Sequence, residues 1–117
     1  MQFQQVSDEL ALASQLSLAD FEALVAQGFK TFINNRPDGE GADQPPRAEF
    51  EARAKALGVT YHYLPLEIGQ MPSVELAAAF QKALKESPMP AVAYCRSGNR
   101  SGQILKLAMT LPAHESS

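Results

Sequence analysis

The single cysteine of the chain, Cys95, begins a run of small and basic residues. The run reads Cys-Arg-Ser-Gly-Asn-Arg-Ser-Gly and covers positions 95–102. Because an apolar stretch, residues 91–94, precedes it, the thiol is expected at the end of a strand. A thiol placed before a glycine-containing loop that an arginine closes is typical of a nucleophile that faces an anion.

Only the thiolate form of a cysteine is a strong nucleophile, and this loop favours that form. The backbone N–H groups of residues 97–101 can curl into an anion-binding nest, and the following helix directs the positive end of its dipole to the same point. Arg100 stays charged and can donate to two oxygens of one oxyanion. We therefore predict that Cys95 and Arg100 are catalytic. The predicted anion-binding residues are Arg96, Ser97, Gly98, Asn99 and Ser101.

The alternative interpretation of Cys95 is a small buried residue that only fills space at a strand end, which is the usual role of a lone cysteine. The glycine and the two arginines of the loop have no purpose in such packing. The sequence therefore favours the functional interpretation.

Two further segments supply secondary candidates. Arg36 is suited to hold a substrate anion, and Asp38 to anchor an arginine or to act as a general acid; the alternative is a turn with a surface ion pair. Glu67 is a second candidate acid. The two histidines, His62 and His114, stand in a strand-like stretch and in the tail, so we expect no metal site, and nothing indicates a cofactor.

The composition of the chain excludes several classes of protein. With 117 residues, a net charge of -3 and a pI near 5.3, it lacks the basic surface that a nucleic-acid-binding protein needs. No apolar run approaches the roughly 18 residues of a membrane span, and the N-terminus has no signal-peptide pattern. A single cysteine rules out an intrachain disulfide, so we expect a reducing cytoplasmic location.

Helix-like and strand-like segments alternate along the chain. Capping residues and apolar periodicity predict helices over residues 18–27, 45–57, 73–86 and 101–109. Apolar runs predict a short edge strand over residues 10–13 and buried strands over residues 29–34, 59–64 and 91–94.

This alternation predicts an α/β fold with three layers, in which flanking helices cover a mainly parallel central sheet. Ligands of such sheets bind beyond the carboxyl ends of the strands. The loops after Asn34, Leu64 and Tyr94 are expected to meet there. We predict one domain over residues 1–117, with a frayed end over residues 113–117.

The segment Tyr-Cys-Arg-Ser-Gly-Asn-Arg-Ser, residues 94–101, resembles the active loop of rhodanese-type sulfurtransferases. The rest of the chain differs from that family and has no segment similar to its Gly-His-Ile-Pro-Gly-Ala. Instead, Gly-Phe-Lys-Thr-Phe-Ile-Asn-Asn-Arg-Pro-Asp (28–38) and Gly-Val-Thr-Tyr-His-Tyr-Leu-Pro-Leu (58–66) resemble a dual-specificity tyrosine phosphatase scaffold. Over about residues 3–110 the combination resembles the beta-lactamase hydrolase-like protein, phosphatase-like domain family, of the DUF442 type. The resemblance implies a tyrosine-phosphatase-like fold and, for some members, fusion to sulfide-metabolising enzymes.

Both chemistries use a thiolate in an anion nest, and three features separate them. Four residues lie between Cys95 and Arg100, one fewer than in tyrosine phosphatases, and Tyr94 stands where phosphatases usually have histidine. No aspartate occurs between Asp43 and Cys95 to serve as general acid, although Asp38 and Glu67 remain candidates.

These features favour a cysteine-dependent sulfurtransferase that forms a persulfide. The alternative is a phosphatase that forms a thiophosphate intermediate, and a further alternative is a non-catalytic anion-binding module. The expected partners are a small anionic substrate (thiosulfate, a persulfide or a phosphate ester) and a thiol acceptor. A homodimer or a fusion to a sulfide-metabolising enzyme is also compatible with the sequence.

Overall fold

The computed structural model describes residues 1–112. A five-stranded sheet with the order β1-β2-β5-β3-β4 forms its centre. The strands are β1 Phe3–Gln5, β2 Leu10–Ala13, β3 Thr31–Asn34, β4 Thr60–Tyr63 and β5 Ala91–Tyr94. The helices are α1 Leu18–Ala26, α2 Arg47–Leu57, α3 Val74–Glu86 and α4 Asn99–Thr110.

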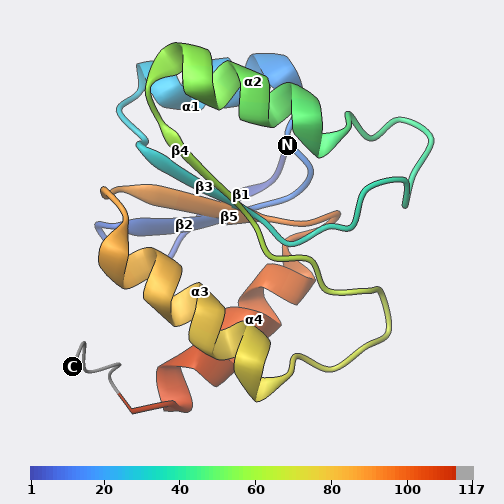
Figure 1. The fold of residues 1–117 in the computed structure, drawn as a ribbon, viewed down its shortest axis with the longest axis vertical. Coiled ribbons are helices and arrows are strands. Elements are labelled where there is room, and N and C mark those ends of the chain that lie inside the picture. The colour runs from blue at the N-terminus through green and yellow to red at the C-terminus, as the bar shows by residue number, and fades with distance from the viewer. Residues whose placement is uncertain (113–117) are drawn as a thin grey trace.

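Two helix layers enclose the sheet (Figure 1): α1 and α2 cover one face, and α3 and α4 cover the other. Strand β5 explains the arrangement, because alternate side chains of a strand point to opposite faces. Val92 and Tyr94 pack in the cluster with α1 and α2, whereas Ala91 and Ala93 pack in the cluster with α3 and α4. The predicted α/β fold with three layers and a mainly parallel sheet is therefore confirmed.

The predicted edge position of residues 10–13 is wrong. Strand β2 lies inside the sheet, where it pairs in parallel with β5 and antiparallel with β1. The unpredicted β1 forms the edge instead. Its residues Phe3–Gln5 are all exposed and mostly polar, so they carry no alternation of apolar and polar positions that would have identified a strand.

The beginnings of α1 and α3 agree with the sequence, whereas α2 begins at Arg47, two residues after the predicted start. Ser17 and Asp20 form a capping box at α1, and Ser73 caps α3. Helix α4 begins at Asn99, two residues before the predicted start, with Gly98 as its N-cap. Arg100 therefore belongs to the first turn of the helix rather than to the preceding loop.

Four parallel strands end at one edge of the sheet, at the right of Figure 1. The loops after β3, β4 and β5 meet there, as the sequence predicts, and the loop after β2 joins them because β2 is the direct neighbour of β5. This edge is the place where the chain gathers its candidate chemistry. Among residues 1–112, no helix has the length and apolar character that crossing a membrane would require.

Candidate active site

The Cys95 loop wraps around the sulfur atom. Cys95 follows β5 directly and is fully buried. The backbone N–H of Gly98 donates to Cys95 Sγ at 3.1 Å. Gly98 has a φ of 93°, in the left-handed region that favours glycine, and a Cβ at this position would lie 3.4 Å from the carbonyl oxygen of Ala13. The glycine thus allows the loop to turn back over the thiol.

The cysteine loop offers backbone N–H donors to a ligand, whereas two of its carbonyl acceptors are used by the protein. The carbonyl of Arg96 accepts from the N–H of Gln15 at 3.1 Å, and the carbonyl of Gly98 accepts from the N–H of Gly102 at 3.0 Å. Within the described part of the chain, four backbone N–H groups of the loop and first helical turn have no protein acceptor. They belong to Arg96, Ser97, Arg100 and Ser101. Free N–H groups at a helix N-terminus are suited to bind an anion.

The loop after β2 supports the cysteine loop from the neighbouring strand. The backbone N–H of Cys95 donates to the carbonyl of Ala13 at 3.4 Å, and Gln15 holds the Arg96 carbonyl as described above. Sequence reasoning missed this support because it placed residues 10–13 at the edge of the sheet. The parallel register of β2 and β5, in which Ala13 is opposite Tyr94, brings the two loops together.

Arg100 is anchored by three hydrogen bonds and keeps one edge of its guanidinium open. Its Nη1 and Nη2 donate to the two carboxylate oxygens of Glu40, each at 2.7 Å, and Nη1 also donates to the carbonyl of Leu66 at 2.9 Å. The remaining N–H groups, on Nε and Nη2, lie along one edge of the planar group and can donate to two oxygens of one oxyanion. The hydrogen bond that Arg100 donates to Glu40 raises the pKa of Arg100, and nearby Cys95 raises it further.

Glu40 was not predicted, yet it is the acceptor that joins both arginines of the site. It also accepts from Arg36 Nε at 2.8 Å. The hydrogen bond from Arg100 is the main reason that the pKa of Glu40 falls to about 2, so this side chain is a carboxylate at neutral pH. Glu40 stands in Asp-Gly-Glu-Gly, residues 38–41, a pattern that indicates only a turn.

Ser101 binds Asn35, and the direction of this hydrogen bond can be derived. Asn35 Nδ2 donates to the carbonyl of Leu64 at 2.8 Å, and a carbonyl is only an acceptor. Asn35 Oδ1 must therefore face Ser101, whose Oγ donates to it at 2.8 Å. The hydroxyl proton of Ser101 is thus committed to Asn35 instead of the sulfur. Ser101 does not cap the helix either, because Gly98 holds that position.

The secondary candidates Arg36 and Asp38 are both bound to other side chains of the protein. Arg36 is buried, and its Nη1 donates to Gln15 Oε1 at 3.1 Å, in addition to its bond to Glu40. This arrangement makes Arg36 a support for Glu40 rather than a surface for an anion. Asp38 accepts from the backbone N–H of Arg47 at 2.9 Å and pairs with the side chain of the same residue. Asp38 therefore forms an exposed ion pair at the start of α2, which matches the alternative interpretation of a turn with a surface ion pair.

Tyr94 faces away from the cysteine loop. Its side chain packs against Phe50 of α2, with ring centroids 5.9 Å apart, and its hydroxyl lies 2.6 Å from that of Tyr61. Burial raises the pKa of Tyr94 well above its ordinary value. The use of Tyr94 as an indicator of sulfur chemistry therefore has no basis in a contact with the sulfur.

A cleft of about 540 Å³ adjoins the cysteine loop. On one side it is lined by the loop after β4, and on the other by the cysteine loop and α4; its lining residues are Ile68, Gly69, Gln70, Met71, Arg96, Ser97, Asn99, Arg100 and Gln103. Glu67 is exposed and is not among them. We call this space the substrate cleft.

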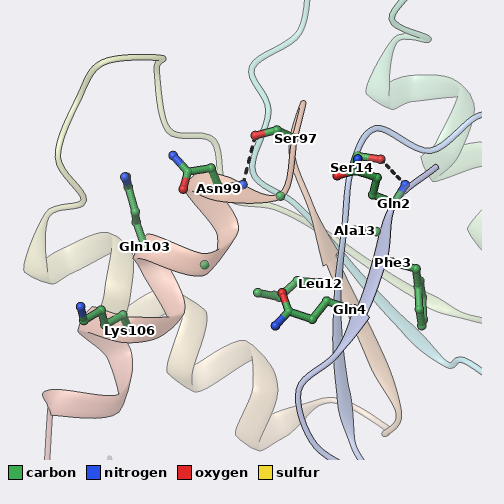
Figure 2. A pocket seen from close by; sticks show the side chains of 12 residues that line it. Gln2, Phe3, Gln4, Leu12, Ala13, Ser14, Ser97, Asn99, Gln103 and Lys106 are labelled. Atoms are coloured by element: carbon green, nitrogen blue, oxygen red, sulfur yellow. Dashed lines mark hydrogen bonds between the residues drawn. The ribbon is translucent and has the colours of Figure 1, made fainter.

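A second cleft of about 580 Å³ lies on the other flank of the same loop. Figure 2 shows it between the first residues of the chain, Gln2 to Gln4, and the start of α4. Lys106 lines this second cleft but not the substrate cleft. Among residues 1–112, no group of three or more histidine, cysteine, aspartate or glutamate side chains is arranged to hold a metal ion.

Comparison with known sequences identifies one protein family. The model of the family described as beta-lactamase hydrolase-like protein, phosphatase-like domain, matches residues 2–111. A beta-lactamase hydrolase-like protein of Agrobacterium fabrum is 36% identical over 96 residues, which are 82% of this chain and 22% of that protein. A protein of the same name from Xylella fastidiosa is 29% identical over 108 residues, 92% of this chain and 25% of that protein. The chain thus spans about a quarter of the length of these curated relatives.

Solved structures with the same fold are named as phosphatases. A candidate phosphatase of Neisseria meningitidis has a TM-score of 0.80 and 28% identity, with coverage of 93% of this chain and 79% of that one. A candidate phosphatase of Shewanella putrefaciens, labelled DUF442, has a TM-score of 0.77 and 23% identity, with coverage of 92% and 66%. The catalytic core of a PP-IP phosphatase of S. cerevisiae has a TM-score of 0.68 and 18% identity, with coverage of 87% and 60%. The predicted tyrosine-phosphatase-like fold is therefore confirmed.

Proposed function

Because this chain belongs to the beta-lactamase hydrolase-like protein, phosphatase-like domain family, we propose that it hydrolyses phosphate monoesters with Cys95 as the nucleophile. The preferred sequence-based hypothesis was sulfur transfer, with phosphate hydrolysis as its alternative. The fold and the relatives support phosphatase chemistry better than sulfur transfer. The shorter loop between Cys95 and Arg100 still offers free backbone N–H groups, so loop length alone does not exclude a phosphoryl group.

The proposed reaction has two steps. The Cys95 thiolate attacks phosphorus, so that an S–P bond forms while the ester P–O bond breaks, and the leaving group departs with the electron pair. A water molecule then attacks phosphorus and loses a proton to solvent. The S–P bond breaks, and inorganic phosphate and the thiolate are released.

The roles of the other residues follow from where charge develops. The free N–H groups of Arg96, Ser97, Arg100 and Ser101 and the open edge of Arg100 donate to the equatorial phosphoryl oxygens. The Gly98 N–H, 3.1 Å from Sγ, stabilises the thiolate. Cys95 itself is fully buried, so these donors lie between the sulfur and the solvent.

The observation that carries this proposal is the orientation of Arg100. Glu40 and Leu66 occupy the end of the guanidinium and leave its Nε edge open, and Cys95 is near enough to raise the pKa of Arg100. The ion pair with Glu40 thus leaves Arg100 with donors for an anion in the neighbourhood of the thiol.

Sulfur transfer remains a second candidate because of one observation on the carboxyl groups. Asp38 is held by Arg47, Glu40 is an ion-paired carboxylate, and Glu67 does not line the substrate cleft. None of them presents an acidic proton to a leaving group in this conformation. Departure of sulfite from thiosulfate requires no general acid, whereas departure of an alkoxide does.

The direct test is turnover of p-nitrophenyl phosphate by the wild-type protein, Cys95→Ser and Arg100→Lys. Wild type should release p-nitrophenol, Cys95→Ser should be inactive, and Arg100→Lys should lose about 100-fold in kcat/KM because lysine cannot donate from a rigid planar edge. Thiosulfate and cyanide are assayed in parallel. Thiocyanate formation that depends on Cys95, without ester hydrolysis, would replace the phosphatase proposal by sulfur transfer.

A further inference from the structure

The substrate cleft is larger than the nest that surrounds the sulfur. Its volume of about 540 Å³ lies within the range of roughly 300–1,000 Å³ of small-molecule sites. A phosphoryl group bound at Arg96, Ser97 and Arg100, which line the cleft, fills only part of this space. The remaining volume is available to the group that is esterified to the phosphate. The residues in the walls of the cleft therefore indicate the chemical character of that group.

One wall of the cleft is apolar. Ile68 and Met71 belong to the loop between β4 and α3, and 61% and 83% of these side chains, respectively, are exposed. Large apolar side chains that are exposed together beside a polar cleft indicate a binding surface. Covering them with an apolar part of a ligand removes this area from water and favours binding.

The opposite wall carries the positive charge of Arg96. Arg96 is exposed and makes no ion pair within the described part of the chain. Arg100, by contrast, is held by Glu40 and is near enough to Cys95 for the thiol to raise its pKa. The reacting phosphoryl group therefore uses Arg100, and the charge of Arg96 is left for a second anionic group.

From the two walls together we infer that the substrate is a phosphate ester whose leaving group has an apolar body and a second negative charge. The apolar body packs against Ile68 and Met71, and the second anion pairs with Arg96. This inference rests on the proposed phosphatase function and adds the chemical class of the leaving group to it. Ile68, Met71 and Arg96 are then specificity-determining residues.

The test measures binding of three phosphonates, which cannot be hydrolysed, to the Cys95→Ser protein by calorimetry. Methylphosphonate reports on the nest alone, benzylphosphonate adds an apolar body, and 4-carboxybenzylphosphonate adds a second negative charge. Affinity should increase in that order. Adding Arg96→Ala should weaken 4-carboxybenzylphosphonate by roughly fivefold, as expected for an exposed ion pair, and leave benzylphosphonate unchanged.

Two more variants separate the two walls. Met71→Ser should weaken both benzyl compounds by roughly threefold and leave methylphosphonate unchanged. Lys106→Ala is the matched control for Arg96→Ala, because it removes one positive charge from the second cleft, and it should change none of the three affinities.

Equal affinities of the three phosphonates, or equal effects of Arg96→Ala and Lys106→Ala, would overturn the inference. Hydrolysis of phenyl phosphate and 4-carboxyphenyl phosphate by the wild-type protein is measured beside them. If neither ester is hydrolysed, the proposed phosphatase function fails, whatever the phosphonate affinities show. If both are hydrolysed at the same kcat/KM and the phosphonates bind equally, the function stands and only the inferred leaving-group class is wrong.

Discussion

At Glu40, three hydrogen bonds from two buried arginines meet on one carboxylate. Arg36 donates to this carboxylate and fixes its position. The carboxylate in turn accepts two hydrogen bonds from Arg100 and fixes the orientation of that guanidinium. The residue that determines the direction of the Arg100 guanidinium is therefore an acidic side chain 60 positions away in sequence. Glu40 is a positioning residue in this account, since its carboxylate is fully used by the arginines.

Glu40→Gln tests this positioning role. The amide lacks the charge and the second acceptor oxygen, so Arg100 loses its two-point anchor and the open edge is no longer fixed. We expect kcat/KM for an aryl phosphate to fall by about tenfold, while Glu49→Gln on the exposed face of α2 leaves it unchanged. An unaltered kcat/KM and an unaltered affinity for inorganic phosphate in Glu40→Gln would remove Glu40 from the account.

The same carboxylate should make stability depend on acid. Its pKa in the folded protein is about 2, below its ordinary value of 4.5, so it contributes stability that is complete above pH 4.5 and is lost as the pH falls towards 2. The difference in free energy of unfolding between wild type and Glu40→Gln should therefore shrink over this interval. Urea titrations at a series of pH values measure it, and a constant difference would contradict the ion-pair description.

Ser101→Ala separates a structural hydroxyl from a catalytic one. The substitution leaves the buried Oδ1 of Asn35 without a donor, so we expect a loss of about 1–3 kcal/mol in the free energy of unfolding. The rate of Cys95 alkylation by iodoacetamide at neutral pH should not change, because the Ser101 proton is already committed to Asn35. A large decrease in that rate would mean that the hydroxyl serves the sulfur.

At the scale of elements, the turn between β5 and α4 depends on the backbone of Gly98. A side chain there is strained at a φ of 93° and would meet the carbonyl of Ala13 in the neighbouring loop. Gly58 is a natural control, because it also has a positive φ of 74°, ends α2, and has open space around its Cα.

Gly98→Ala and Gly58→Ala should therefore have similar costs of about 1 kcal/mol in stability but different effects on function. Only Gly98→Ala should displace the N–H that binds the sulfur, and we expect it to reduce phosphate affinity and kcat/KM by about tenfold or more. Calorimetric titration with phosphate and steady-state kinetics measure the two effects. Equal phosphate affinity in both variants would show that the loop tolerates a different path.

The sequence predicted the elements that have strong local signals. The alternation of helices and apolar strands, the capping by Ser17 and Ser73, and the three site loops all appear in the structure. The neighbour of β5 could not be predicted, because strand order depends on packing of the whole sheet. Because β1 forms the edge, β2 lies inside the sheet next to β5. The loop after β2 therefore contacts Cys95.

For the whole molecule, the composition of the cysteine loop could be read from sequence, but the ion pairs and hydrogen bonds that surround it could not. Cys95, Gly98 and Arg100 lie within six consecutive positions, so their proximity follows from chain connectivity. Glu40 and Asn35 come from a distant loop and reach the site only because β3 lies beside β5. Their roles depend on hydrogen-bond direction, which residue spacing does not encode.

The molecule thus combines a phosphatase-like fold with a compact thiol site. In the proposed reaction, Cys95 carries the phosphoryl group as a covalent intermediate. Rapid acid quench of the protein with p-nitrophenyl phosphate, followed by intact mass spectrometry, tests that claim most directly. We predict an adduct of about 80 Da on the peptide that contains Cys95, absent in Cys95→Ser. A protein that turns over the ester without this adduct, or that instead gains about 32 Da from thiosulfate and never a phosphoryl group, would contradict the account.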